Sequence, residues 1–350
     1  MDDMMSSSSS ATPSLHYPHY EPPAEGQRLE LAPGIGWVRM HLPFALNHIN
    51  LWLLDDGDAL TAIDSGFGID RTRTAWEQVL AADPRPLRRV IVTHHHPDHI
   101  GLAAWLAARD RATVLMTQGE FLSAHAVWNQ LPGHCIEDMV AQFRSHGLDD
   151  TRLAALSARG PAYRRGAPEL PAHYHRLFAG DTLQIGAHRW RVIVGYGHAP
   201  EHASLYCAEL GILISGDMLL PRISTNISVY AATPGADPLG WFLRSLQALC
   251  ELPEDTLVLP SHGHPFRGIR ARVDQLVEHH RERCAALLAE CAAPRCAGEL
   301  LPTLFPRELD THQVMFAMGE AIAHLNHLET QGALTRDVGA DGLIRFTRPR

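Results

Sequence analysis

The stretch IVTHHHPDHIG at residues 91–101 places four histidines and one aspartate in six consecutive positions, directly after an apolar run. Imidazoles and carboxylates cost free energy when they are buried without partners. A ligand that binds several of them at once supplies those partners. The stretch therefore indicates a binding site rather than ordinary packing.

The segments around this stretch predict a strand before it and a helix after it. Residues 27–63 alternate short apolar runs with Gly, Pro and Asp, which is typical of consecutive β-strands joined by tight turns. Residues 71–82 and 101–110 have helical spacing, and residues 88–93 read as a short β-branched strand. The histidine cluster is therefore predicted at a strand-to-helix junction, where α/β folds place ligands.

The rest of the chain predicts more strands and then a helical tail. Residues 118–175 mix helical pieces with a polar, proline-rich run, which we interpret as a helical cap inserted over the site. Strands return between residues 181 and 266, and each run ends in a histidine or an aspartate. Residues 269–350 predict helices followed by a hairpin with an Asp-Gly turn, a small winged-helix-like domain. Residues 1–26, serine-rich at their start, are predicted to be disordered.

Composition excludes several classes of function. The net charge is −9 and all 30 basic residues are arginines, so Schiff-base and lysine-base chemistry are excluded and a nucleic-acid footprint is disfavoured. No apolar run approaches the roughly 20 residues of a membrane span, and no secretory signal is recognisable. We expect no membrane association and a cytoplasmic location. The six cysteines form no CxxC pair and are expected to be reduced thiols.

The spacing within the histidine cluster aims several side chains at one volume. His94 and His96 are two apart, so in an extended segment they face the same side. Asp98 and His99 follow Pro97, which suits the first turn of a helix. One junction can therefore present four ligands.

Three further candidates end other predicted strands: His198, Asp217 and His262. Imidazole nitrogens combined with carboxylates are ligands that suit zinc. Seven ligands are too many for one tetrahedral ion and about right for two ions that share a bridging ligand. We therefore expect two Zn²⁺, or two similar divalent metal ions, per chain.

The run His94-x-His96-x-Asp98-His99 resembles the HxHxDH signature of the metallo-β-lactamase superfamily. A Gly-His, a Gly-Asp after a strand and a Pro-x-His-Gly follow in the order of that family's remaining ligands. The resemblance covers residues 27–268 and implies an α/β fold, an αββα sandwich. With its C-terminal helical module, the chain looks most like the β-lactamase-like-protein-2 branch.

The resemblance also implies a role for each ligand. It assigns His94, His96 and His198 to the first metal ion, Asp98, His99 and His262 to the second, and the bridge to Asp217. Asp64, in an Asp-Ser-Gly turn, matches a residue that orients a metal-bound histidine.

Several neighbouring residues have open assignments. His95 lies between two ligands and is expected to point away from them. His202 and Arg222 flank ligand strands, so each either contacts substrate or has an ordinary structural role. Spacing alone does not choose between His262 and His264, but the Pro-x-His-Gly match favours His262.

These residues predict a zinc-dependent hydrolase with no covalent enzyme intermediate. A hydroxide shared by two metal ions would be the nucleophile, and Asp98 would aim it. We expect a small-molecule acyl substrate, a thioester or a lactone-type ester. The alternative is a phosphodiesterase or single-strand endoribonuclease, because fold and ligands do not separate these reactions.

Two functions without hydrolysis fit these residues less well. A di-iron redox enzyme is expected to have Glu in place of His96, and a metal-free binding module is expected to lack ligands. The C-terminal module could form a homodimer or cap the active site. DNA reading is disfavoured, because the helix predicted around residues 313–330 has two glutamates and no arginine.

Overall fold

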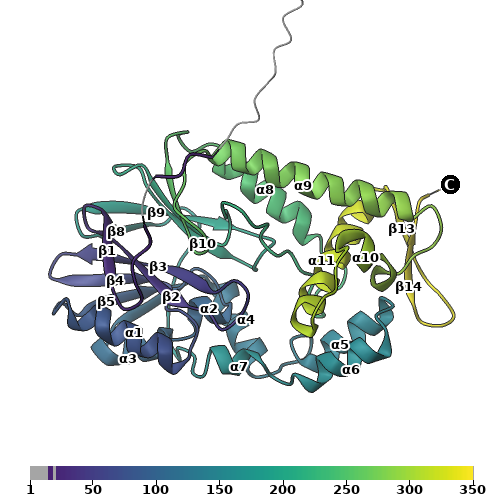
Figure 1. Ribbon diagram of the computed structural model, residues 1–350, viewed down its shortest axis with the longest axis horizontal. Helices are drawn as coiled ribbons and strands as arrows, with labels where there is room; N and C mark the ends of the chain where they lie inside the picture. The colour runs from purple at the N-terminus through teal and green to yellow at the C-terminus, as the bar shows by residue number, and fades with distance from the viewer. Residues whose placement is uncertain (1–14, 19–20, 350) are drawn as a thin grey trace, which may run out of the picture.

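The computed structural model describes residues 15–18 and 21–349. Two β-sheets face each other, with helices on both outer faces (Figure 1). The first sheet has the strand order β1-β2-β3-β4-β5-β6-β7, and the second has the order β12-β11-β10-β9-β8. This is the αββα sandwich that the resemblance predicts, and that prediction is confirmed.

Strands form the inner layers of the sandwich, and helices with a C-terminal hairpin surround them. The strands are β1 (Arg28–Ala32), β2 (Ile35–His41), β3 (His48–Asp56), β4 (Ala59–Ile63), β5 (Leu87–Ile91), β6 (Thr113–Met116), β7 (His175–Arg176), β8 (Thr182–Ile185), β9 (His188–Gly195), β10 (His202–Cys207), β11 (Ile212–Gly216) and β12 (Leu257–Pro260). The helices and the C-terminal hairpin are α1 (Asp70–Ala81), α2 (Pro97–Ile100), α3 (Ala103–Asp110), α4 (Gln118–Trp128), α5 (Ile136–Ser145), α6 (Asp150–Ala158), α7 (Tyr163–Gly166), α8 (Pro238–Leu249), α9 (Ile269–Glu290), η1 (Ala297–Leu300), α10 (Leu301–Leu304), α11 (Thr311–Thr330), β13 (Thr335–Val338) and β14 (Ile344–Thr347).

Alternation along the strands builds the layers. Trp37 of β2 and Trp52 of β3 face the second sheet, and their rings stack with centroids 6.0 Å apart. Val38 and Leu51, one position along each strand, face the opposite way and pack with Trp76 of α1. Successive side chains of a strand point to opposite faces, so β2 and β3, with most side chains on both faces buried, are apolar at most positions.

The strand directions bring the predicted ligands to one edge of the sandwich. β4, β5 and β6 run parallel, and β11 runs parallel to β12. The segments that follow β5, β11 and β12, which carry predicted ligands, therefore emerge at the same edge of the sandwich. Two backbone hydrogen bonds tie the sheets together there, from Asn50 N to Ser261 O at 2.7 Å and from Ala203 N to Thr93 O at 2.9 Å.

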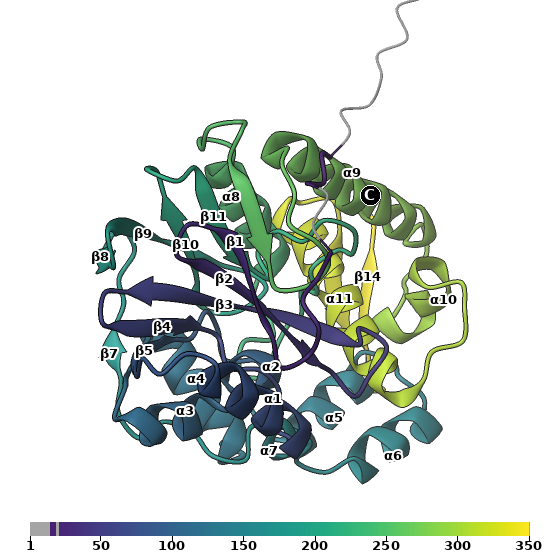
Figure 2. The ribbon, with the colours of Figure 1, turned by 60° about the vertical axis from the view of Figure 1, so that its left-hand side comes forward.

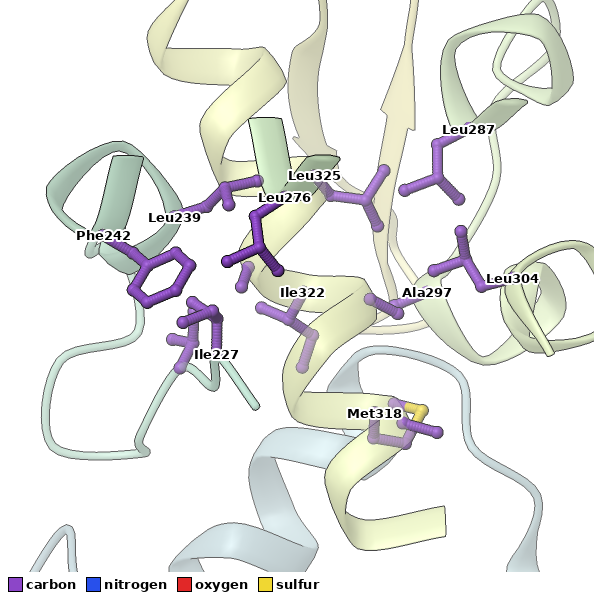
Figure 3. Packing of buried hydrophobic residues seen from close by; sticks show 14 of the residues in the cluster. Ile227, Leu239, Phe242, Leu276, Leu287, Ala297, Leu304, Met318, Ile322 and Leu325 are labelled. Atoms are coloured by element: carbon purple, nitrogen blue, oxygen red, sulfur yellow. The ribbon is translucent and has the colours of Figure 1, made fainter. Parts of the chain in front are cut away.

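The C-terminal elements share one apolar core with the sandwich. Met318, Ile322 and Leu325 of α11 belong to the same buried cluster as Leu239 and Phe242 of α8 (Figure 3). Helices α5 and α6 lie against these elements as well (Figure 2). The hairpin β13–β14 follows α11, as the Asp-Gly turn predicted. The winged-helix label and the boundary at residue 269 stay predictions.

Two expectations concern segments outside the sandwich. Residues 1–14 and 19–20 lie outside the described residues, but His16 exchanges backbone hydrogen bonds with Arg267 at 3.2 and 2.8 Å. Residues 15–18 therefore hold a defined position beside Arg267, and the disorder proposed for residues 1–26 stays a prediction. None of the described helices is long and apolar enough to cross a bilayer.

The shared core predicts a large effect of truncation at Phe242. We expect Phe242→Ala to lower the free energy of unfolding by about 3–5 kcal/mol, because the ring, buried in the shared core and edge-on to His280 of α9, would leave a cavity there. Gln247→Ala, at an exposed position of the same helix, should change it by no more than about 0.5 kcal/mol. Urea unfolding of both variants measures this, and equal midpoints would contradict the shared core.

Candidate metal centre

The structure brings the seven predicted ligands together in three overlapping groups. In each group the possible ligand atoms lie within 4.8 Å of one another. The groups are His94, His96 and His198; His94, His99 and Asp217; and Asp98, His99 and His262. The first and third groups coincide with the two metal sites that the resemblance implies, and the second links them through Asp217.

Hydrogen bonds on one ring nitrogen aim the other nitrogen of four histidines at the centre. The Nδ1 atoms of His198 and His262 donate to backbone oxygens of Asn226 and His48, at 2.8 and 2.9 Å. The Nδ1 of His99 lies 2.8 Å from Asp64 Oδ2. Such bonds on the outer nitrogen are the usual support of metal-bound imidazoles.

The same holds for His94, because the Thr93 hydroxyl bonds Asp64 Oδ2 at 2.8 Å and lies 3.1 Å from His94 Nδ1. His96 differs in presenting its Nδ1, which lies 2.9 Å from His94 Nε2. His198 Nε2 lies 3.2 Å from that same His94 nitrogen. Three imidazole nitrogens therefore converge on one point.

The cluster leaves buried polar atoms that a cation would satisfy. His99 Nε2 and Asp217 Oδ1 are buried without a hydrogen-bond partner. Asp217 Oδ1 lies 3.4 Å from His262 Nε2, which lies 3.5 Å from Asp98 Oδ2. Unpartnered buried donors and acceptors are costly. The donor set, imidazole nitrogen with carboxylate oxygen, fits divalent metal ions such as zinc.

Burial and neighbouring charges set the ionisation of this cluster. Burial, with the charges of the adjacent imidazoles, holds the pKa of His94 and His96 well below the ordinary value, so these rings are neutral and offer lone pairs. Burial raises the pKa of Asp217, but His262 and His99 outweigh it and hold that pKa well below the usual range. Asp217 is therefore an anion in the middle of the cluster.

Asp64 lies where its predicted orienting role requires. Its φ is 61°, a left-handed conformation that aspartate tolerates better than most residues. The carboxylate accepts hydrogen bonds from the Thr93 backbone at 2.7 Å and from the Thr93 hydroxyl, in addition to its contact with His99. Asp64 thus joins the end of β4 to residues 93–99, the loop that carries four of the predicted ligands.

The structure distinguishes the three residues whose roles the sequence left open. His202 is fully buried and its Nε2 accepts a hydrogen bond from Asp217 N at 3.1 Å, which favours the structural role of the two that the sequence left open. Arg222 is exposed, with its guanidinium 5.9 Å from the ring of Tyr17. His264 lies edge-on to Trp37, 6.3 Å between centroids, and belongs to none of the three groups.

Several supporting residues escaped the sequence analysis. His48 and Asn226 act through backbone oxygens, which any residue type supplies. Glu120 of α4 binds His95, which does point away from the cluster as expected, and the Tyr163 hydroxyl donates to the His95 carbonyl. No motif singles out these positions.

Comparison with known proteins identifies a family that agrees with this arrangement of metal ligands. Residues 46–262 match the metallo-β-lactamase superfamily, and residues 284–349 match a metallo-β-lactamase-like C-terminal domain. The chain belongs to the metallo-β-lactamase superfamily. A crystal structure of a β-lactamase domain protein from Burkholderia ambifaria is 45% identical, with a TM-score of 0.88, and the match covers 96% of this chain and 98% of that one.

Curated relatives of this superfamily member are more distant. The probable metallo-hydrolase YqjP of Bacillus subtilis is 27% identical over 85% of this chain and 93% of its own length. A hydroxyacylglutathione hydrolase of Roseobacter denitrificans is 26% identical over 71% and 77%. The β-lactamase-like protein 2 homolog of Caenorhabditis elegans is 22% identical over 69% and 64%. The chain is accordingly a metallo-hydrolase of this superfamily.

The ligand groups predict the metal content. Purified protein should contain close to two equivalents of zinc or a similar divalent ion, because seven ligands serve two sites. Chelation should abolish hydrolysis, and added zinc should restore it. Elemental analysis with activity assays checks this, and full activity without any transition metal would contradict the metal centre.

The positions of His262 and His264 predict opposite effects. His262→Ala should lose most of one metal equivalent, because its Nε2 lies beside both Asp98 and Asp217. His264→Ala should keep both ions and lose at most a modest part of turnover. The number of metal ions bound per chain, measured for each purified variant, decides which histidine is the ligand. One ion in His264→Ala and two in His262→Ala would assign the ligand to His264 instead.

Proposed function

We propose that this protein is a zinc-dependent hydrolase of acyl substrates, with a thioester as the first choice and a lactone-type ester as the second. The convergence of His94, His96, Asp98, His99, His198, Asp217 and His262 carries the proposal. The choice of a thioester is supported by similarity to hydroxyacylglutathione hydrolases, whose reaction is thioester hydrolysis.

The chain's own residues would position the ions and the reacting groups. The two groups of three ligands would each hold one ion, and Asp217 lies between the groups as an anion. When bound, a pair of divalent ions lowers the pKa of water to about 7, which supplies a nucleophile at neutral pH. The Asp98 carboxylate, 15% exposed, would accept a proton from the attacking water and orient it.

Arg222 is the remaining candidate for a contact with substrate. It is exposed, and its charge reaches His264, which lies two residues after the predicted ligand His262. Burial lowers the pKa of His264, and the charges of Arg39 and Arg222 lower it further. We propose that Arg222 attracts an anionic part of the acyl substrate, such as the carboxylate of a thiol carrier. His202 has no such access.

The phosphodiesterase or endoribonuclease reading remains the alternative within the same metal chemistry. A net charge of −9 without any lysine weighs against an extended contact with nucleic-acid phosphates. Zinc as the native metal, two ions per chain and a cytoplasmic location belong to this proposal as well. Dimerisation through the C-terminal elements stays a prediction.

A substrate panel tests the proposal. Purified protein with two zinc ions should hydrolyse acyl-glutathione and acyl-CoA thioesters or lactones, and should act poorly on short single-stranded RNA and bis(p-nitrophenyl) phosphate. Steady-state rates on each substrate measure this. Turnover confined to RNA or phosphodiesters would overturn the acyl assignment and favour the alternative.

Asp98→Asn separates chemistry from folding within that panel. Asparagine keeps the shape but removes the charge and the ability to accept a proton, so we expect turnover to fall at least about a hundredfold. The circular dichroism spectrum should match that of the unmodified protein. A variant with near-normal turnover would refute the role of Asp98.

A further inference from the structure

One carboxylate outside the ligand set holds two ligand-bearing segments at once. Glu120 lies in the first turn of α4, and its side chain is fully buried. It is not among the seven predicted ligands, and it has no part in the proposed reaction. Its partners lie in the loop of residues 94–99 and in the segment of residues 198–202.

The first partner is His95, which sits between two predicted ligands. Glu120 Oε2 accepts hydrogen bonds from the His95 backbone N at 2.9 Å and from its Nδ1 at 2.6 Å. The Tyr163 hydroxyl donates to the His95 carbonyl from the other side. His95 is therefore fixed in both backbone and side chain, and His94 and His96 are fixed with it.

The second partner is Glu201, three positions after His198. Glu120 Oε1 accepts a hydrogen bond from Glu201 N at 2.6 Å. In return, the Glu201 carboxylate accepts from Gly119 N at 2.8 Å, and its carbonyl accepts from the Thr117 hydroxyl at 2.7 Å. The start of α4 and the segment after His198 thus bind each other reciprocally.

All three groups that meet the Glu120 carboxylate are N–H donors. A carboxylate offers acceptors on both oxygens, whereas a glutamine amide replaces one of them with a donor. Burial raises the pKa of Glu120, but the charge of His95 and these hydrogen bonds outweigh it and lower the pKa below its ordinary value. The site is therefore matched to an ionised carboxylate.

We propose that Glu120 is a positioning residue that presets His94, His96 and His198 for the first metal ion. It does so by holding His95 and Glu201, and through them the two loops, at a fixed separation. The inference rests on the proposed metal centre. Residues that support metal ligands from outside typically change metal affinity 10- to 100-fold when mutated, and we expect about that range here.

Glu120→Gln tests the proposal with a readout of metal binding. In the better of its two orientations, the glutamine oxygen keeps the bonds to His95 and its amide group faces the Glu201 N–H, so the segment carrying His198 is released. Competition against a chromogenic chelator should show one of two zinc ions bound about 10- to 100-fold more weakly. Glu77→Gln, which removes an exposed carboxylate on α1, should match the unmodified protein.

The spectrum of the cobalt-substituted protein separates positioning from general stability. If Glu120 presets the ligands, the d–d absorption of one Co²⁺ should shift or weaken in Glu120→Gln. A lower unfolding temperature of the metal-free variant with unchanged zinc affinity and unchanged cobalt spectrum would overturn the proposal. Failure of the unmodified protein to bind two ions would instead refute the metal centre itself.

A second pair of variants keeps the test decisive if Glu120→Gln does not fold. His95→Asn retains an N–H donor close to the position of Nδ1, whereas His95→Ala removes it. We expect His95→Ala to lose zinc affinity and His95→Asn to retain most of it. Equal zinc affinities for these two variants would contradict the role of the Glu120 contact.

Discussion

The carboxylate of Asp64 is the contact on which the metal centre depends most. It binds the backbone and hydroxyl of Thr93 and the Nδ1 of His99, and the Thr93 hydroxyl in turn supports His94. One buried carboxylate therefore fixes the end of β4, the end of β5 and the orientation of two rings. The strained φ of Asp64 is offset by these hydrogen bonds.

Other hydrogen bonds fix the ligands that Asp64 does not reach. Backbone oxygens fix His198 and His262, and Glu120 ties the two ligand segments together from α4. His48 begins β3, Glu120 lies in α4, and Asn226 lies in the segment between β11 and α8. Buried rings held on their outer nitrogen have little freedom to turn away, so the centre is organised by the fold itself.

The ligands were predictable from sequence because their residue types and spacing are both distinctive. The supports were not, since the carbonyls of His48 and Asn226 have no side-chain signature and Glu120 reaches His95 only through tertiary packing. The strands were predictable from their apolar runs and turns, and the αββα sandwich from the family resemblance of the ligand motif, whereas the pairing of His16 with Arg267 joins residues far apart in the chain. Local pattern does not encode such contacts.

The central claim is that this fold presents two adjacent metal sites built from the seven ligands. Diffraction from crystals of the zinc-loaded protein, recorded at the zinc absorption edge, tests it most directly. The account predicts two anomalous peaks about 3.5–4 Å apart, one beside His96 Nδ1 and the Nε2 atoms of His94 and His198, the other beside His262 Nε2. A single peak, or peaks away from these nitrogens, would contradict it.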